Sequence, residues 1–113
     1  MTDPTAHGIA ALSAWIDGAN THRDPEAQTW SRIGKITEEA GEAIAAFIGM
    51  TGQNPRKGIT HARADVEDEL LDVAITALAA LEHLRGHDEQ CLVLLARKVE
   101  QTLARADLGP QGP

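Results

Sequence analysis

The stretch that decides the fold is HARADVEDELLDVAITALAALEHLR, residues 61–85. It contains neither glycine nor proline, and it is rich in alanine and leucine, which favour helices. On a helical wheel of about 100° per residue, its apolar residues form two separate sides. One side holds Val66, Leu70, Val73, Ala77 and Leu81, and the other holds Leu71, Ile75, Leu78 and Ala79. The pattern predicts a long helix that is buried on both flanks.

Two helices are predicted before this stretch. Asp3-Pro4 and Asp24-Pro25 each place a capping carboxylate before a proline, which is favoured in the first turn of a helix. Apolar residues follow both pairs at helical spacing. We therefore expect helices over about residues 5–18 and 26–50.

Glycines and capping residues define the remaining boundaries. Residues 51–58 contain two glycines and an Asn-Pro pair, which is typical of a loop. Thr60 is expected to cap the helix over 61–85, and Gly86 to follow its end. Asp88 is expected to cap a fourth helix that ends before Gly109.

The composition also favours an all-α fold. The 113 residues include 19 alanines and 11 leucines, but only four valines and no tyrosine. A β-sandwich or barrel needs more β-branched and aromatic residues. We expect one all-α domain over residues 1–108, with four helices that form an oligomeric helical bundle, and a disordered tail over residues 109–113.

Charge and sequence context limit the classes of partner. Acidic side chains outnumber basic ones by 17 to 10, a net charge of −7, which argues against a nucleic acid polymer as partner. No apolar run approaches the ~20 residues of a membrane span, and residues 1–6 lack the regions of a signal peptide. With Cys91 as the single cysteine, no internal disulfide can form. We expect a cytoplasmic protein that does not bind membranes.

The two apolar flanks of the helix over 61–85 predict oligomerisation. A four-helix chain of this size can cover one flank with its own helices. The second flank is therefore expected to meet another subunit, most simply in a symmetric homodimer.

Two carboxylate pairs carry the functional prediction. Glu39 and Glu42 are three residues apart, as are Glu69 and Asp72, so each pair shares a helix face. The two helices should run antiparallel, and at 1.5 Å per residue both pairs lie about 12 to 16 Å from the connecting loop. The pairs should therefore meet across the helix interface.

Carboxylates held together repel one another unless a cation lies between them. An all-oxygen set without Cys or His suits Mg²⁺, with Mn²⁺ as a substitute, rather than zinc. Glu38 lies about 100° around the helix from Glu39, where it either reaches a second metal ion or is solvated.

These residues carry a resemblance to a known family. KITEEAGE (residues 35–42) and ELLDV (residues 69–73), with 26 residues between Glu42 and Glu69, resemble the EExxE and ExxD motifs of MazG-like all-α nucleoside triphosphate pyrophosphohydrolases. The resemblance covers about residues 28–85. It implies that Glu39, Glu42, Glu69 and Asp72 hold Mg²⁺. It also implies hydrolysis of an NTP or dNTP to the monophosphate and pyrophosphate, as in nucleotide-pool housekeeping.

The chemistry also suits the residues themselves. A triphosphate carries about four negative charges, so an acidic protein can bind it only through metal ions, which also help to generate a nucleophilic water. Glu38 and Glu39 are the catalytic candidates, with Glu38 as the base that orients this water. Lys35 either contacts a phosphate or forms an i,i+4 salt bridge with Glu39.

Further candidates for substrate binding lie outside the two motifs. Arg56 and Lys57 in the loop could clamp phosphates, although the loop is about 12 to 16 Å from the carboxylates unless it reaches a neighbouring subunit's site. Trp15 and Trp30 either stack on a nucleobase or fill the core.

The remaining polar residues are expected to have no part in the site. Surface positions are predicted for five acidic residues, Glu67, Asp68, Glu82, Glu89 and Glu100. The five histidines, at positions 7, 22, 61, 83 and 87, are expected at the surface or in caps, and Cys91 as a small buried residue.

Two other functions compete with the hydrolase. A di-iron carboxylate bundle needs Glu-x-x-His motifs, and the sequence contains none. A non-catalytic helical dimer that acts as a regulatory or interaction module remains the alternative. The release of pyrophosphate distinguishes it from the hydrolase.

Overall fold

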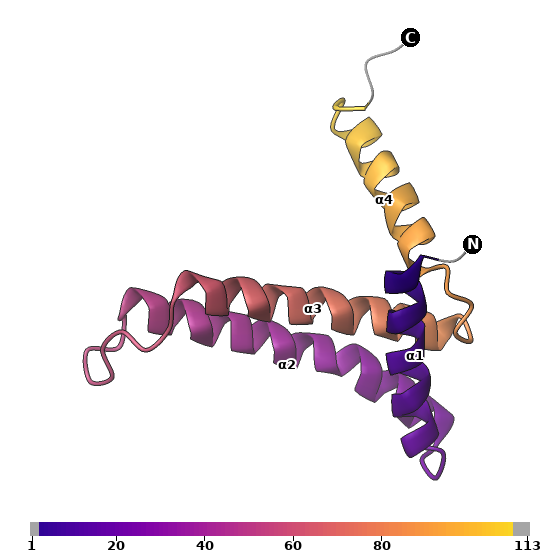
Figure 1. Ribbon diagram of the computed structural model, residues 1–113, viewed down its shortest axis with the longest axis horizontal. Helices are drawn as coiled ribbons and strands as arrows, with labels where there is room; N and C mark the ends of the chain where they lie inside the picture. Colours follow the sequence, from indigo (N-terminus) through magenta and orange to yellow (C-terminus); the bar gives the residue numbers. More distant parts are fainter. Residues whose placement is uncertain (1–2, 110–113) are drawn as a thin grey trace.

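The computed structural model describes residues 3–109, and in this range the chain is all-helical (Figure 1). The four helices are α1 (Pro4–Ala19), α2 (Pro25–Thr51), α3 (Arg63–Leu84) and α4 (Cys91–Arg105). The prediction of an all-α chain with four helices is confirmed. Of the tail expected over residues 109–113, all but Gly109 lies outside the described residues.

The starts of α1 and α2 follow the Asp-Pro signals. The Asp3 carboxylate accepts a hydrogen bond from the Thr5 amide at 2.7 Å, and the Asp24 carboxylate accepts one from the Ala27 amide at 3.1 Å. Each proline is at the first position of its helix, where no intrahelical N–H is needed. Both predicted caps are confirmed.

The predicted caps of α3 and α4 are wrong. α3 begins after Ala62, whose amide donates to the Asp65 carboxylate at 2.8 Å, while the Thr60 amide donates to the carbonyl of Gly49. α4 begins after Gln90 rather than at Asp88. The carboxylate that caps the start of α4 is that of Glu82 on α3, which accepts a hydrogen bond from the Cys91 amide.

α2 and α3 lie side by side and antiparallel, as the longest elements of the molecule (Figure 1). Small residues allow the close approach, since Ala43 and Ala46 of α2 are buried. At the loop end, a Cβ on Gly49 would collide with the side chains of Thr60 and His61. Glycine at this position lets the segment before α3 pack directly on α2.

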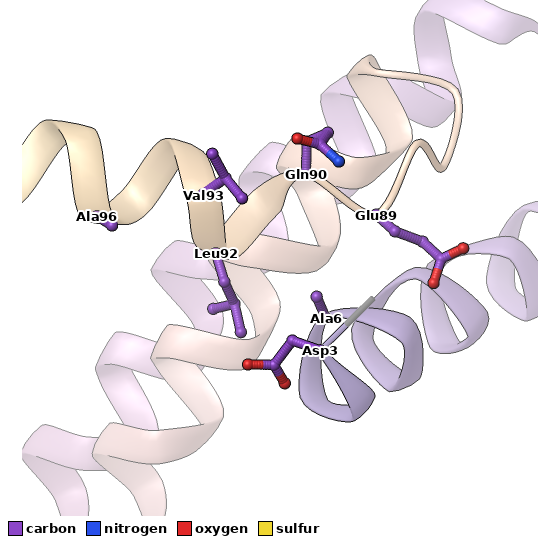
Figure 2. Close-up of a pocket in the computed structure, with 7 residues that line it drawn as sticks. All are labelled: Asp3, Ala6, Glu89, Gln90, Leu92, Val93 and Ala96. Atoms are coloured by element: carbon purple, nitrogen blue, oxygen red, sulfur yellow. The ribbon is translucent and has the colours of Figure 1, made fainter. Parts of the chain in front are cut away.

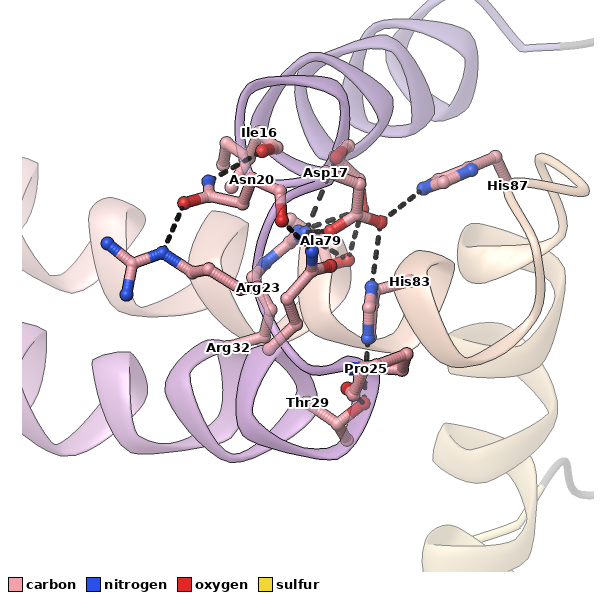
Figure 3. A network of polar contacts seen from close by, with 12 residues as sticks. Ile16, Asp17, Asn20, Arg23, Pro25, Thr29, Arg32, Ala79, His83 and His87 are labelled. Carbon is pink, nitrogen blue, oxygen red and sulfur yellow. Dashed lines mark hydrogen bonds and ion pairs between the residues drawn. The ribbon is translucent and has the colours of Figure 1, made fainter.

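A buried polar network holds α1 across the hairpin (Figure 3). Arg32 of α2 is 9% exposed. Its guanidinium donates to Asp17 Oδ1 at 2.7 Å, to Ser13 Oγ at 2.8 Å and to the carbonyl of Ala79 at 3.0 Å. One side chain thereby joins α1, α2 and α3.

Two histidines complete this network; the predicted surface position is wrong for His83, whose side chain is 13% exposed, whereas His87 is 28% exposed in the connection after α3. Oδ2 of Asp17 lies 2.7 Å from Nδ1 of His83 and 3.0 Å from Nε2 of His87 (Figure 3). The other ring nitrogen of His83 contacts the Thr29 hydroxyl at 2.9 Å. Asp17 therefore holds both histidines as well as Arg32.

Glu82 was expected at the surface but is fully buried. Its two carboxylate oxygens accept hydrogen bonds from the amides of Glu89 and Cys91, each at 3.0 Å. The carboxylate thus caps the start of α4 from within α3. Cys91 is buried as expected, and burial, followed by the nearby Glu82, raises the pKa of its thiol to about 11.

The chain is far from spherical, and much apolar surface is exposed. α4 projects away from the hairpin (Figure 1), and the radius of gyration is 17.5 Å, whereas a compact chain of this length has about 13 Å. Leu70, Leu71 and Ile75 of α3 are 56%, 62% and 42% exposed. Within the described residues, none of the helices combines the length and apolarity required to cross a bilayer.

We expect Glu82→Ala to lower the free energy of unfolding by about 3 kcal/mol, because the buried amide of Cys91 and the part-buried amide of Glu89 lose a charged acceptor. Urea unfolding measures this change, and limited proteolysis should show earlier cleavage in residues 85–105. Glu100→Ala, on an exposed position of α4, should change the stability by less than about 0.5 kcal/mol. Equal effects of the two variants would contradict the capping role.

The Asp17 network predicts a dependence of stability on pH. Burial alone would raise the pKa of Asp17, but the hydrogen bond with His83 and the charge of Arg32 outweigh it and hold the pKa below 3.8. A carboxyl group with a lowered pKa stabilises the fold above its unfolded pKa, and this contribution is lost as the pH falls through the folded pKa.

Asp17→Asn should therefore destabilise the protein at pH 7 by about 3 kcal/mol, because the buried Arg32 loses its counter-ion. The difference from the parent should shrink as the pH falls below about 4, when Asp17 itself becomes protonated. Urea unfolding at several pH values tests this, with the exposed Glu26→Gln as control. A difference that stays constant down to about pH 2 would contradict the assignment.

Candidate metal centre between the long helices

Three carboxylates meet between α2 and α3. Glu39 comes from α2, and Glu69 and Asp72 come from successive turns of one α3 face. One carboxylate oxygen from each residue lies within 4.8 Å of the other two. All three residues are half-buried. The antiparallel pairing of the helices, which sets these positions at one level, brings the acidic groups together as expected.

Among the described residues, one cation forms a salt bridge with the cluster: the Lys35 ammonium lies 3.8 Å from Oε1 of Glu39. Oε2 of Glu69 is buried and has no hydrogen-bond partner. Burial, followed by the negative charge of Glu42, raises the pKa of Glu39, and the charge of Lys35 opposes this only in part. A buried carboxylate oxygen without a partner requires an explanation, and a bound cation provides one.

The donor set fits Mg²⁺. This ion takes oxygen ligands at about 2.1 Å, so two ligands of one ion lie at most about 4.2 Å apart. Oxygens within 4.8 Å of one another therefore need only a small side-chain movement to share an ion. Carboxylates without Cys or His also match Mg²⁺ or Mn²⁺ better than zinc.

Glu42 stands beside this group rather than in it. Its oxygens are not among those within 4.8 Å, and the residue is exposed on α2 one turn from Glu39. Its charge nevertheless raises the pKa of Glu39. The structure therefore brings together three of the four predicted ligands, with the fourth adjacent.

Lys35 forms salt bridges at the edge of the cluster. Its ammonium lies 2.9 Å from Oε1 of Glu38 and 3.8 Å from Oε1 of Glu39. The hydrogen bond to Glu38 raises the pKa of Lys35. Glu38 itself is largely exposed and held by this lysine. Lys35 thus forms the predicted kind of salt bridge in this structure. Glu38 pairs with Lys35 and is not among the three carboxylates of the cluster.

The other predicted substrate contacts lie on the surface. Arg56 and Lys57 are in the loop after α2, where Asn54 accepts hydrogen bonds from both of their amides at 3.1 Å. Trp15 on α1 and Trp30 on α2 are 73% and 71% exposed, so neither fills the core of this chain. Their exposure leaves the indoles accessible for stacking.

Sequence reasoning missed a pair of adjoining cavities where α1 meets the hairpin. The first, of about 210 Å³, is lined by Ile16, Ser31, Arg32, Lys35 and Thr76. The second, of about 140 Å³, shares three of these residues and adds Asp17, Asn20, Arg23 and Gln28. Three helices contribute to this space, so spacing along one helix could not reveal it. The only signal was the cluster of Asn, Arg and Gln residues at 20–28.

No family model, curated protein or solved structure matches the chain. The resemblance of residues 28–85 to MazG-like enzymes therefore stays a prediction. The assignment of a function depends on the geometry of the carboxylates and their surroundings.

We expect Glu39→Gln to raise the melting temperature of the metal-free protein by a few degrees at pH 7. The pKa of Glu39 is raised, so its charged form opposes folding; this effect shrinks as the pH falls through the folded pKa and is gone below the unfolded pKa. The same variant should lose at least half of the stabilisation that millimolar Mg²⁺ gives the parent. Thermal unfolding with and without Mg²⁺ measures both effects.

Glu67→Gln is the matched control, because Glu67 is also on α3 but is exposed and paired with Arg63 at 2.9 Å. It should leave both melting temperatures unchanged. Glu82 is unsuitable as a control because it is buried. An equal loss of the Mg²⁺ effect in Glu67→Gln would show that general acidity, rather than the cluster, binds the ion.

Proposed function

We propose that the protein is a Mg²⁺-dependent nucleoside triphosphate pyrophosphohydrolase that acts as a cytoplasmic homodimer. The observation that carries the proposal is the cluster of Glu39, Glu69 and Asp72, in which a buried oxygen of Glu69 lacks a partner. The KITEEAGE and ELLDV motifs supply these residues. Their resemblance to MazG-like enzymes supports the choice of reaction.

Electrostatics explains the need for a metal in this protein. A chain with a net charge of −7 and an acidic cluster repels a triphosphate unless cations lie between them. Glu39, Glu69 and Asp72 would hold Mg²⁺, with Glu42 next to them. Bound Mg²⁺ supplies charge neutralisation on the phosphates and lowers the pKa of a bound water.

The residues around the cluster have complementary roles in this proposal. Lys35 is already within reach of Glu38 and Glu39, so its ammonium can turn to a phosphate oxygen. Glu38 then loses its partner and can accept the proton of the attacking water. The water oxygen bonds to the α-phosphorus, while the bond from that phosphorus to the oxygen bridging the α- and β-phosphates breaks. The products are the monophosphate and pyrophosphate.

The cavities beside Lys35 provide space for the nucleoside. They extend from Lys35 and Thr76 towards Asn20, Arg23 and Gln28, whose amide and guanidinium groups can hydrogen-bond a base. Thr76 is one turn beyond Asp72 on α3, so the cavity begins next to the cluster. A nucleotide lying along this path would place its phosphates at the carboxylates.

The exposed apolar surface supports the homodimer. Leu70 and Leu71 lie on the two predicted flanks of α3 and are both more than half exposed. Large apolar side chains on both flanks of one helix are typical of surfaces that meet a partner.

The test is release of pyrophosphate from a panel of NTPs and dNTPs. We expect turnover with Mg²⁺ or Mn²⁺, none with EDTA, and no recovery with Zn²⁺ alone. Glu69→Gln should reduce kcat/KM by about 100-fold or more, because a charged ligand is lost while the shape is kept. Glu67→Gln should retain the parent rate. If no triphosphate is hydrolysed although Mg²⁺ stabilises the fold, the non-catalytic interaction module is the better description.

A further inference from the structure

α4 has an apolar stripe that its own chain covers only in part. The stripe consists of Leu92, Leu95, Val99 and Leu103, at helical spacings of three and four. The first turn of α4 is anchored through the buried Cys91 and through Leu92, which packs against the core. Beyond it, Leu95 and Val99 are 43% and 49% exposed, and the helix extends away from the hairpin (Figure 1).

The connection between α3 and α4, residues 85–90, sets this direction. Glu82 caps the helix start, and Asp17 holds His87. His87 and Glu89 both adopt positive φ, of 64° and 63°, a conformation that is uncommon for residues other than glycine. An open cleft of about 530 Å³ separates the start of α4 from the start of α1 (Figure 2). α4 is therefore held outward rather than folded against its own hairpin.

A groove of matching chemistry lies on the α2–α3 hairpin. It has a volume of about 410 Å³, and every lining residue is apolar: Ala40, Ala43, Ile44, Phe47, Val66, Leu70 and Val73. Three of them, Ile44, Phe47 and Leu70, are 63%, 52% and 56% exposed. The groove is near the loop end of the hairpin, whereas α4 leaves from the opposite end (Figure 1).

Length and charge fit α4 to this groove. At 1.5 Å per residue, the stripe from Leu95 to Leu103 spans about 12 Å, and the groove residues 40–47 of α2 span about 10 Å. α4 carries three basic residues and one acid, whereas α3 carries six acids and Arg63 as its only Lys or Arg. Opposite charges around an apolar contact favour the pairing and set its register.

We propose that α4 of a second copy of this chain lies in the groove, and that the symmetric exchange of α4 helices forms the dimer interface. This inference rests on the homodimer of the proposed function. A folded chain of 12.1 kDa exposes about 6,000 Å², whereas this one exposes 8,155 Å². The excess is larger than the ~800 Å² per partner that a standard interface buries.

The proposed contact leaves the carboxylate cluster accessible. On α3, the centre of the stripe formed by Val66, Leu70 and Val73 lies about a quarter-turn around the helix from the midpoint of Glu69 and Asp72, so the cluster borders the groove without lining it. Formation of the interface and hydrolysis can therefore be tested separately.

Cysteine pairing tests the interface in the full chain. A tagged Leu95→Cys protein is co-expressed with an untagged Ile44→Cys protein and oxidised with copper phenanthroline, and a second pair combines Val99→Cys with Leu70→Cys. We expect a disulfide-linked heterodimer from at least one pair on a non-reducing gel. Gln101→Cys, on the opposite side of α4 from the stripe, should give about tenfold less heterodimer with either partner. The parent, whose Cys91 is buried, should give none.

Three results would overturn the proposal. Equal cross-linking through Gln101→Cys would show random collision. Efficient self-linking of Ile44→Cys, without either heterodimer, would show that the hairpins of two copies pack face to face instead. A 12 kDa monomer by light scattering at micromolar concentration would exclude any dimer, while pyrophosphate release from the same sample would leave the hydrolase assignment intact.

Discussion

The buried ion pair of Arg32 and Asp17 is the interaction on which the arrangement of the first three helices depends. A guanidinium removed from water must have its charge and its donors satisfied. Arg32 achieves this with a carboxylate and a hydroxyl from α1 and a carbonyl from α3. These partners are available together only when α1 crosses the hairpin in one orientation. The same crossing creates the cavities beside Lys35, so the position of the proposed nucleoside site follows from the placement of one charge.

The carboxylate cluster has the opposite energetic character. Arg32 gains partners on folding, whereas Glu39, Glu69 and Asp72 are brought together without enough of them. A natural protein retains such a local conflict where function requires it, because surrounding contacts hold the groups in place. Here the small residues of the α2–α3 interface, Ala43 and Ala46, provide this support next to the acidic groups. Within α2 and α3, some turns thus stabilise the packing, whereas neighbouring turns carry the carboxylates of the proposed site.

The sequence predicted the features that depend on local pattern. Asp-Pro pairs marked the starts of α1 and α2, and equal distances from the loop placed Glu39 level with Glu69 and Asp72. The buried role of Glu82 and the half-buried role of His83 could not be predicted, because each depends on which helices pack together at that end of the hairpin. A helical wheel gives the direction in which a side chain points, but not which helix it packs against. For the same reason the exposed position of Trp15 and Trp30, and the cavities between three helices, became visible only in the fold.

The attachment of α4 to α3 also affects the reactivity of the Cys91 thiol. The thiol of Cys91 is enclosed beside the Glu82 carboxylate and has a pKa of about 11. At pH 7 only about one molecule in ten thousand carries the reactive thiolate, and oxidants attack that form. The only sulfhydryl in the chain is therefore kept chemically silent by the same carboxylate that orients the last helix. Burial thus protects the thiol from oxidation at the point where α4 is attached to the rest of the chain.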